Sequence, residues 1–147
     1  MPQEVGRTNE LHRLTISQLL IGLILVIWNG FGLALAVSFQ TGQIDLPDAV
    51  SEQYFETQPL WLALFTDSGP LCGLAGAVAL LLQHRVAVKL FAAQFVILAI
   101  ATVYELAIGR SLIQVTGAPI GATLVSFGLL AAQYLYARWL EQRGKLY

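Results

Sequence analysis

The acidic residue Asp67 lies inside a long apolar stretch of the chain. A carboxylate at the centre of a membrane costs about 2.5–3.5 kcal/mol on insertion scales, so we expect Asp67 to face protein or water rather than lipid. Asn29, Thr123 and Ser126 lie in two other apolar stretches and are its candidate partners. Together these residues could form a site that handles protons or cations. Alternatively, a protonated Asp67 bonded to Asn29 or to a hydroxyl group would hold two helices together.

Pro70 follows Asp67 by three residues and belongs to the same candidate polar site. A proline inside a helix removes one backbone hydrogen bond and leaves the carbonyl oxygen of Thr66 without its usual partner. The hydroxyl of Ser68, the carboxyl group of Asp67 or water could satisfy that oxygen. We interpret Pro70 as a static kink, with a mobile segment or a small ligand pocket as the alternatives.

Small residues form a second pattern in the same stretch. Gly69, Gly73 and Gly76 recur at spacings of four and three, which places them on one face of a helix. Gly32 and Gly121, in the first and last apolar stretches, are candidate counterparts. Such a face lets two helix backbones approach closely, either within the chain or between the chain and a partner.

The sequence lacks the spacings that are typical of catalytic or metal sites. His12 and His84 are far apart, and the single cysteine, Cys72, has no partner for a redox pair. We therefore predict a protein that is not an enzyme and holds no metal. No cofactor is predicted, although the sequence is compatible with a bound lipid or pigment. The net charge of −1 and the absence of a basic cluster predict no nucleic-acid partner.

The composition indicates which elements position these residues. Of the 147 residues, 56% are hydrophobic and 12% are charged, whereas a soluble domain has about 25% charged residues. Four stretches exceed the roughly 20 apolar residues that a membrane-spanning helix needs; they cover residues 14–39, 59–82, 86–108 and 119–140. The first is too long for a signal-peptide core. We predict one domain, residues 1–147, that is an all-α integral membrane four-helix bundle with antiparallel up-down topology.

The basic residues indicate the orientation of this bundle. Seven of the eight lysines and arginines fall on one side of the predicted spans, and only Arg110 falls on the other. By the positive-inside rule, we expect both termini in the cytoplasm and a multi-pass protein of the bacterial inner membrane. The outer loop, residues 40–58, carries Pro47 among acidic residues, which suits the start of a short interfacial helix. An irregular loop is the alternative.

Three sequence segments resemble those of a known family. They are WNGFG at residues 28–32, PLW at 59–61 and GLAGAVALLLQHR at 73–85. They are similar to an uncharacterised family of small four-helix bacterial membrane proteins with a W-N-x-x-G first span, which are often labelled automatically as sugar transporters. Leu35 and Ala36 depart from the acid-aromatic pair that members tend to carry, and members usually have small or apolar residues near Asp67. The resemblance implies the fold and no established activity.

Two functions agree with these features. In the first, the protein is a non-catalytic accessory or stabilising subunit that packs against other membrane proteins or against itself, surrounded by membrane lipids. Short loops and small-residue helix faces favour it. In the second, it is an oligomeric small-solute or proton-coupled transporter that uses Asp67. We favour the first, because no second acidic residue lies deep enough to extend a proton relay, and Gln94 alone does not make a pathway.

Overall fold

Within the residues that the structure describes, the chain forms four helices and no strands. A computed structural model describes residues 15–43, 58–107 and 120–147, without the side chains of residues 120 and 122. The helices are α1 (Ile16–Gln40), α3 (Leu60–Leu81), α4 (Val86–Ala107) and α6 (Ile120–Gln142). The predicted all-α four-helix bundle is therefore confirmed. The predicted interfacial helix falls largely on residues 44–57, which lie outside the described residues, as does Arg110.

Local sequence signals determine where the helices begin and end. The side chain of Thr15 accepts a hydrogen bond from the backbone of Gln18, whose own side chain bonds back to Thr15, so a capping box starts α1. Helix α3 begins directly after Pro59. After Leu81 the chain turns through Gln83, which adopts a left-handed conformation with φ of 56°. This short turn makes α3 and α4 antiparallel neighbours.

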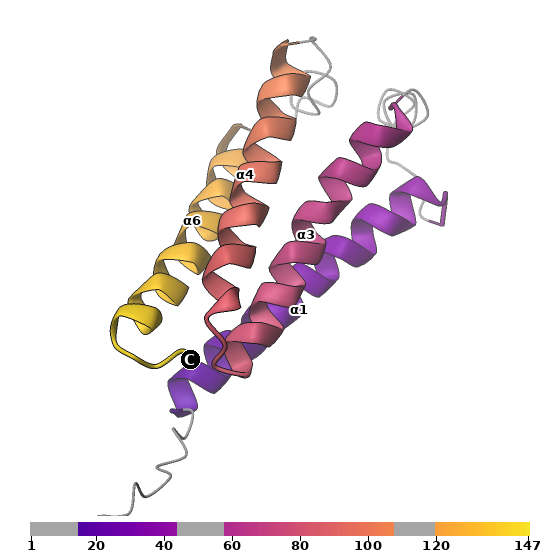
Figure 1. Cartoon of the computed structure of the whole chain (residues 1–147). Coiled ribbons are helices and arrows are strands. Elements are labelled where there is room, and N and C mark those ends of the chain that lie inside the picture. The colour runs from indigo at the N-terminus through magenta and orange to yellow at the C-terminus, as the bar shows by residue number, and fades with distance from the viewer. Residues whose placement is uncertain (1–14, 44–57, 108–119) are drawn as a thin grey trace, which may run out of the picture.

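The two central helices are α3 and α4, and the two outer helices are α1 and α6. Helix α3 packs most extensively against α4 and then against α1, while α6 packs against α4 (Figure 1). Helix α1 runs obliquely behind α3 in Figure 1. The chain therefore passes up and down through the bundle, and α1 meets α6 over only a short length.

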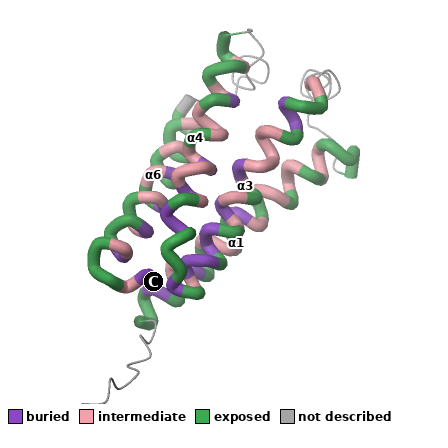
Figure 2. The backbone as a smooth tube through the Cα atoms, in the orientation of Figure 1, coloured by how far each residue is buried: buried purple, intermediate pink, exposed green. Residues whose placement is uncertain are grey.

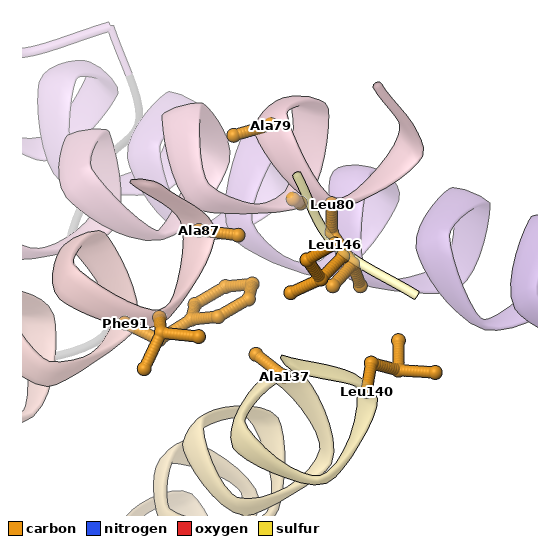
Figure 3. Close-up of a cluster of buried hydrophobic side chains, with 9 residues drawn as sticks. Ala79, Leu80, Ala87, Phe91, Ala137, Leu140 and Leu146 are labelled. Carbon is orange, nitrogen blue, oxygen red and sulfur yellow. The ribbon is translucent and has the colours of Figure 1, made fainter. Parts of the chain in front are cut away.

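A buried apolar cluster closes one end of the bundle. Its members come from α3, α4, α6 and the C-terminal segment, and Figure 3 shows Phe91 and Ala137 beside Leu80 and Leu146. They are Ala77, Ala79, Leu80, Ala87, Val88, Phe91, Ala137, Leu140 and Leu146. Phe91 and Leu146 are the largest side chains that are completely enclosed, being 1% and 2% exposed. The core thus includes a residue from beyond the last helix.

The C-terminal segment is held on the turn between α3 and α4. After α6 the chain reverses at Gly144, where φ is +65°. The backbone N–H of Tyr147 then donates to the carbonyl oxygen of Gln83 at 2.8 Å, and the N–H of Arg85 donates to the backbone oxygen of Tyr147 at 3.1 Å. The side chain of Arg85 also donates to the carbonyl oxygen of Leu146 at 3.2 Å. These bonds seat Leu146 in the core.

Figure 2 shows that many residues of the helices are exposed, and large apolar side chains are numerous among them. Within the described residues, α1, α3 and α4 are long and apolar enough to cross a membrane. Helix α6 is not among these three. Of the three apolar helices, α1 is the least covered by the rest of the chain. In the most apolar 18-residue stretch of each helix, 11% is buried in α1, 33% in α3 and 28% in α4.

Candidate functional site

Three amide side chains meet at the centre of the bundle. Asn29 of α1, Gln94 of α4 and Gln133 of α6 are each 3% exposed. Nε2 of Gln94 donates to Oδ1 of Asn29 at 2.7 Å, and Nδ2 of Asn29 donates to Oε1 of Gln133 at 2.9 Å. We call these three residues the amide triad. It joins three helices that are far apart in sequence through two buried hydrogen bonds.

The carbonyl oxygen of Leu25 determines which way each amide in the triad points. Nδ2 of Asn29 also donates to this oxygen, one helical turn earlier, at 2.8 Å. A carbonyl oxygen can only accept, so the nitrogen of Asn29 must lie on that side and its oxygen on the other. Gln133 therefore presents its oxygen to Asn29, and Gln94 presents its nitrogen. The hydrogen-bond partners fix an assignment that the shape of the amides alone would leave open.

Helix α3 contributes the space that the triad occupies. A Cβ atom added at Gly73 would collide with Oδ1 of Asn29 and with Nε2 of Gln94, and would lie 2.6 Å from Cδ of Gln94. A side chain at this position would therefore displace two members of the triad. All four described helices thus contribute to this centre. Helices α1, α4 and α6 supply the amides, and α3 supplies a glycine that leaves room for them.

The other glycines of α3 lie against α4. An added Cβ at Gly69 would come within 2.9 Å of the side chain of Leu98, and one at Gly76 would come within 3.0 Å of Phe91. The predicted small-residue face of α3 thus packs inside this chain. At the two candidate counterparts, Gly32 and Gly121, an added Cβ would meet nothing within 4 Å among the described residues.

The structure places Asp67 near an end of the bundle. Oδ1 of Asp67 accepts a hydrogen bond from Nε2 of Gln40, the last residue of α1, at 2.9 Å. Asn29, its first candidate partner, bonds to the triad and to Leu25 instead. On α6, Thr123 is half-buried and Ser126 is exposed. The carboxyl group thus links α3 to the end of α1.

Helix α3 continues without interruption through Pro70. The hydroxyl of Ser68 donates to the carbonyl oxygen of Phe65, and the hydroxyl of Thr66 donates to the carbonyl oxygen of Leu62 at 3.0 Å. These hydroxyls therefore bond to the turn that precedes the proline. The Ser68 hydroxyl thus bonds to Phe65 and not to the carbonyl oxygen of Thr66.

Sequence reasoning missed two parts of this centre. The sequence pattern alone does not indicate Gln133, and it gives Gln94 no partner. The available signal was one strongly polar, uncharged residue near the middle of each of three apolar stretches, with a glycine in the fourth. Because buried polar groups in a membrane need partners, such residues are expected to find one another.

An apolar groove runs beside the triad between α1 and α6. It has a volume of about 260 Å³. Its walls are formed by Ile21, Ile24, Leu25 and Trp28 of α1 and by Leu129, Ala132, Gln133 and Tyr136 of α6. Gln133 is thus a member of the triad and also a wall residue of this groove.

The chemistry available in the triad is limited to hydrogen bonding. Amides do not gain or lose protons near neutral pH, so the triad positions groups but cannot relay a proton by titration. No group of three side chains that could hold a metal ion occurs in the described parts of the chain. Comparison with protein-family models, curated proteins and solved structures finds no match to this chain.

Proposed function

We propose that the protein is a non-catalytic integral membrane protein that acts as an accessory or stabilising subunit, packing against other membrane proteins or against copies of itself. The observation that carries this proposal is the exposure of α1. This helix is supported mainly by α3, and large apolar side chains such as Ile27 and Phe31 are 70% and 61% exposed. A long apolar helix with a free flank suits a subunit that packs against other membrane helices.

The internal polar groups support the same proposal. The triad bonds Asn29 to Gln94 and Gln133, so these amides serve to join helices. Asp67 bonds to Gln40 near the end of α1 rather than to the triad. The polar side chains inside the bundle therefore tie the protein together, which is what a packing subunit requires.

The membrane placement is part of the proposal. Three helices are apolar enough to cross a bilayer, and we infer that α6 crosses beside α4, to which it is bound along the core cluster. The distribution of basic residues supports cytoplasmic termini and the bacterial inner membrane. Four crossings keep both termini on one side.

Native mass spectrometry after mild solubilisation tests the proposal. We expect the solubilised protein to be found in a complex of defined stoichiometry, either with another membrane polypeptide or with further copies of itself. Gly32 offers a variant that adds bulk to α1 where no atom of the chain lies within 4 Å of the new Cβ, and Gly121 offers the same on α6. Gly32→Phe is expected to reduce the association, while Gly121→Phe leaves it intact. A lone monomer from every mild detergent would contradict the proposal.

A further inference from the structure

A second groove, between α4 and α6, is open to the surroundings of the bundle. It is lined by Ala92, Phe95 and Val96 of α4 and by Ala131, Tyr134 and Leu135 of α6. Val96 and Leu135 are 52% and 62% exposed, so the groove is reached from outside. Its volume of about 360 Å³ is more than twice the roughly 150 Å³ of an engineered apolar cavity that binds benzene. The groove therefore has room for a segment of an acyl chain.

Each wall of this groove continues into a basic residue. Lys89 lies three residues before Ala92 and seven before Val96. Arg138 lies three residues after Leu135 and seven after Ala131. Residues at these spacings share one face of a helix, so Lys89 extends the α4 wall and Arg138 extends the α6 wall.

The packing of α4 against α6 brings the two basic residues to the same end of the groove. Figure 1 shows the two helices side by side. Phe91, near the start of α4, and Ala137, near the end of α6, belong to the same buried cluster. Lys89 precedes Phe91 by two residues, and Arg138 follows Ala137 directly. Both basic side chains are exposed, so their charges are accessible at one level of the bundle.

A hydrogen bond connects Arg138 to the wall of the groove. Nη1 of Arg138 donates to the hydroxyl oxygen of Tyr134 at 3.4 Å, and Tyr134 is itself a wall residue. A tyrosine hydroxyl that accepts one hydrogen bond can still donate another. The guanidinium and the hydroxyl thus lie together at the end of the groove, and both can donate to an anion.

Other basic side chains at this end of the bundle already have partners. The side chain of Arg85 donates to the carbonyl oxygen of Leu146, and the guanidinium of Arg143 lies 4.2 Å from the centre of the Trp139 ring. Within the described parts of the chain, Lys89 and Arg138 form no ion pair. Two positive charges without a counter-charge at the end of an apolar groove are complementary to an anion that carries an apolar chain.

The depth of the two charges indicates which anion this is. Lys89 is the fourth residue of α4, and Arg138 is four residues from the end of α6, which places each about 5–6 Å along the axis from its helix end. Lysine and arginine side chains near helix ends extend toward the membrane interface. Lipid headgroups lie at that level, and basic pockets between membrane helices bind anionic headgroups.

From these observations we propose that the groove between α4 and α6 binds an anionic phospholipid, with its phosphate between Lys89 and Arg138 and one acyl chain along the groove. One molecule then supplies both the anion and the apolar chain at the depths where they fit. The ring of Tyr134 contacts the chain, and its hydroxyl donates to the headgroup. This proposal rests on the membrane placement given above and not on the accessory role, which uses the flank of α1.

Native mass spectrometry of the full-length protein with added lipid provides the test. The probes are phosphatidylglycerol and phosphatidylcholine with identical acyl chains, titrated into the detergent-solubilised protein. We expect the first phosphatidylglycerol to bind about five- to thirtyfold more tightly than the first phosphatidylcholine, which is the effect of one to two cationic contacts with an anionic headgroup. Equal binding of the two lipids would overturn the proposal.

Two double variants separate the site from the general charge of this end. Lys89→Gln with Arg138→Gln changes two exposed residues and is expected to abolish the preference for phosphatidylglycerol. Arg143→Gln with Lys145→Gln removes the same number of charges from the same end but touches no wall residue or its continuation, and is expected to keep the preference. An equal loss in both double variants would show non-specific attraction and overturn the proposed site.

A further pair of variants tests the groove itself. Ala131→Phe fills it and is expected to weaken binding of phosphatidylglycerol at least fivefold. Ala75→Phe, at an exposed alanine of α3, is the matched control and leaves binding unchanged. Unchanged binding in an Ala131→Phe protein whose circular dichroism matches that of the parent would contradict a chain in this groove.

Photo-crosslinking distinguishes a lipid from a neighbouring helix. A photoreactive amino acid at Leu135 in native membranes is expected to label phospholipid. Discrete polypeptide adducts there would assign the groove to a partner helix and overturn the lipid site. Adducts from Ile27 and Phe31 of α1 report separately on the accessory role, so the failure of either proposal is visible on its own.

Discussion

Asn29 and Gln133 lie 104 positions apart in sequence, yet their side chains share a buried hydrogen bond of 2.9 Å that joins α1 to α6. This contact matters because α1 and α6 otherwise touch little. Loss of the bond would leave each outer helix attached mainly to its central neighbour. The pair is therefore the place where the bundle is closed.

A double-mutant cycle at this pair measures the strength of the closure. We expect Asn29→Leu and Gln133→Leu each to destabilise the fold by about 1–3 kcal/mol, because each removes the buried hydrogen bond and leaves one of its two polar atoms without that partner. The double variant should be less destabilised than the sum of the two, with a coupling energy of about 0.5–1.7 kcal/mol, the range seen for hydrogen bonds between membrane helices. Equilibrium unfolding in mixed micelles gives these values. Strict additivity would mean that the bond contributes nothing.

Gly73→Ala is expected to disrupt the triad from the side of α3. The new methyl group would collide with Asn29 and Gln94, and the cost of overpacking is typically about 1–3 kcal/mol. Gly32→Ala is the control, because its methyl group meets no atom within 4 Å and alanine favours a helix by about 0.5–1 kcal/mol over glycine. The free energies of unfolding of the two variants, measured under the same conditions, should change in opposite directions. A neutral Gly73→Ala would show that the triad has room to move.

Leu146→Ala tests whether the C-terminal segment is part of the core. Leu146 is 2% exposed and lies among core residues of three helices, and truncating a buried leucine costs about 2–5 kcal/mol. Tyr147→Ala is the matched control, because this neighbouring side chain is 68% exposed and its backbone bonds are retained. In thermal unfolding of the purified proteins, Leu146→Ala should melt at a lower temperature than Tyr147→Ala. Equally small effects of the two substitutions on the melting temperature would contradict the burial of Leu146 in the core.

Asp67→Asn separates the structural role of this residue from a transport role. The asparagine oxygen can still accept from Gln40, so we expect the free energy of unfolding to change by less than about 1 kcal/mol. Gln40→Leu removes the donor and serves as the comparison. In proteoliposomes, any proton or solute flux measured with the parent protein is expected to persist in Asp67→Asn. Such a flux, lost in a variant that remains folded, would support the transporter alternative and contradict the accessory role.

The helices could be predicted from sequence because their cause is local. Long apolar stretches interrupted by turn residues define α1, α3, α4 and α6 to within two residues at each end. The small-residue spacing of Gly69, Gly73 and Gly76 likewise identified one packing face. Composition and periodicity act along a single helix, so one sequence suffices to read them.

The partners of the polar residues could not be predicted in the same way. Asn29 has apolar neighbours that give no preference between Asp67 on α3 and Gln133 on α6. The choice depends on the oblique course of α1 and on the depth at which each residue lies, which result from packing of the whole bundle. Asp67 pairs with Gln40 because the end of α1 reaches its level, leaving Asn29 to the amides.

Photo-crosslinking from α1 in native membranes tests the proposed accessory role most directly. A photoreactive amino acid placed at Ile27 or Phe31, both highly exposed on α1, is expected to give discrete adducts with a polypeptide. The same group at Leu124 of α6, which is 67% exposed, is the control and is expected to label lipid. Lipid adducts alone at both positions of α1 would show that no subunit covers this helix and would contradict the proposed function.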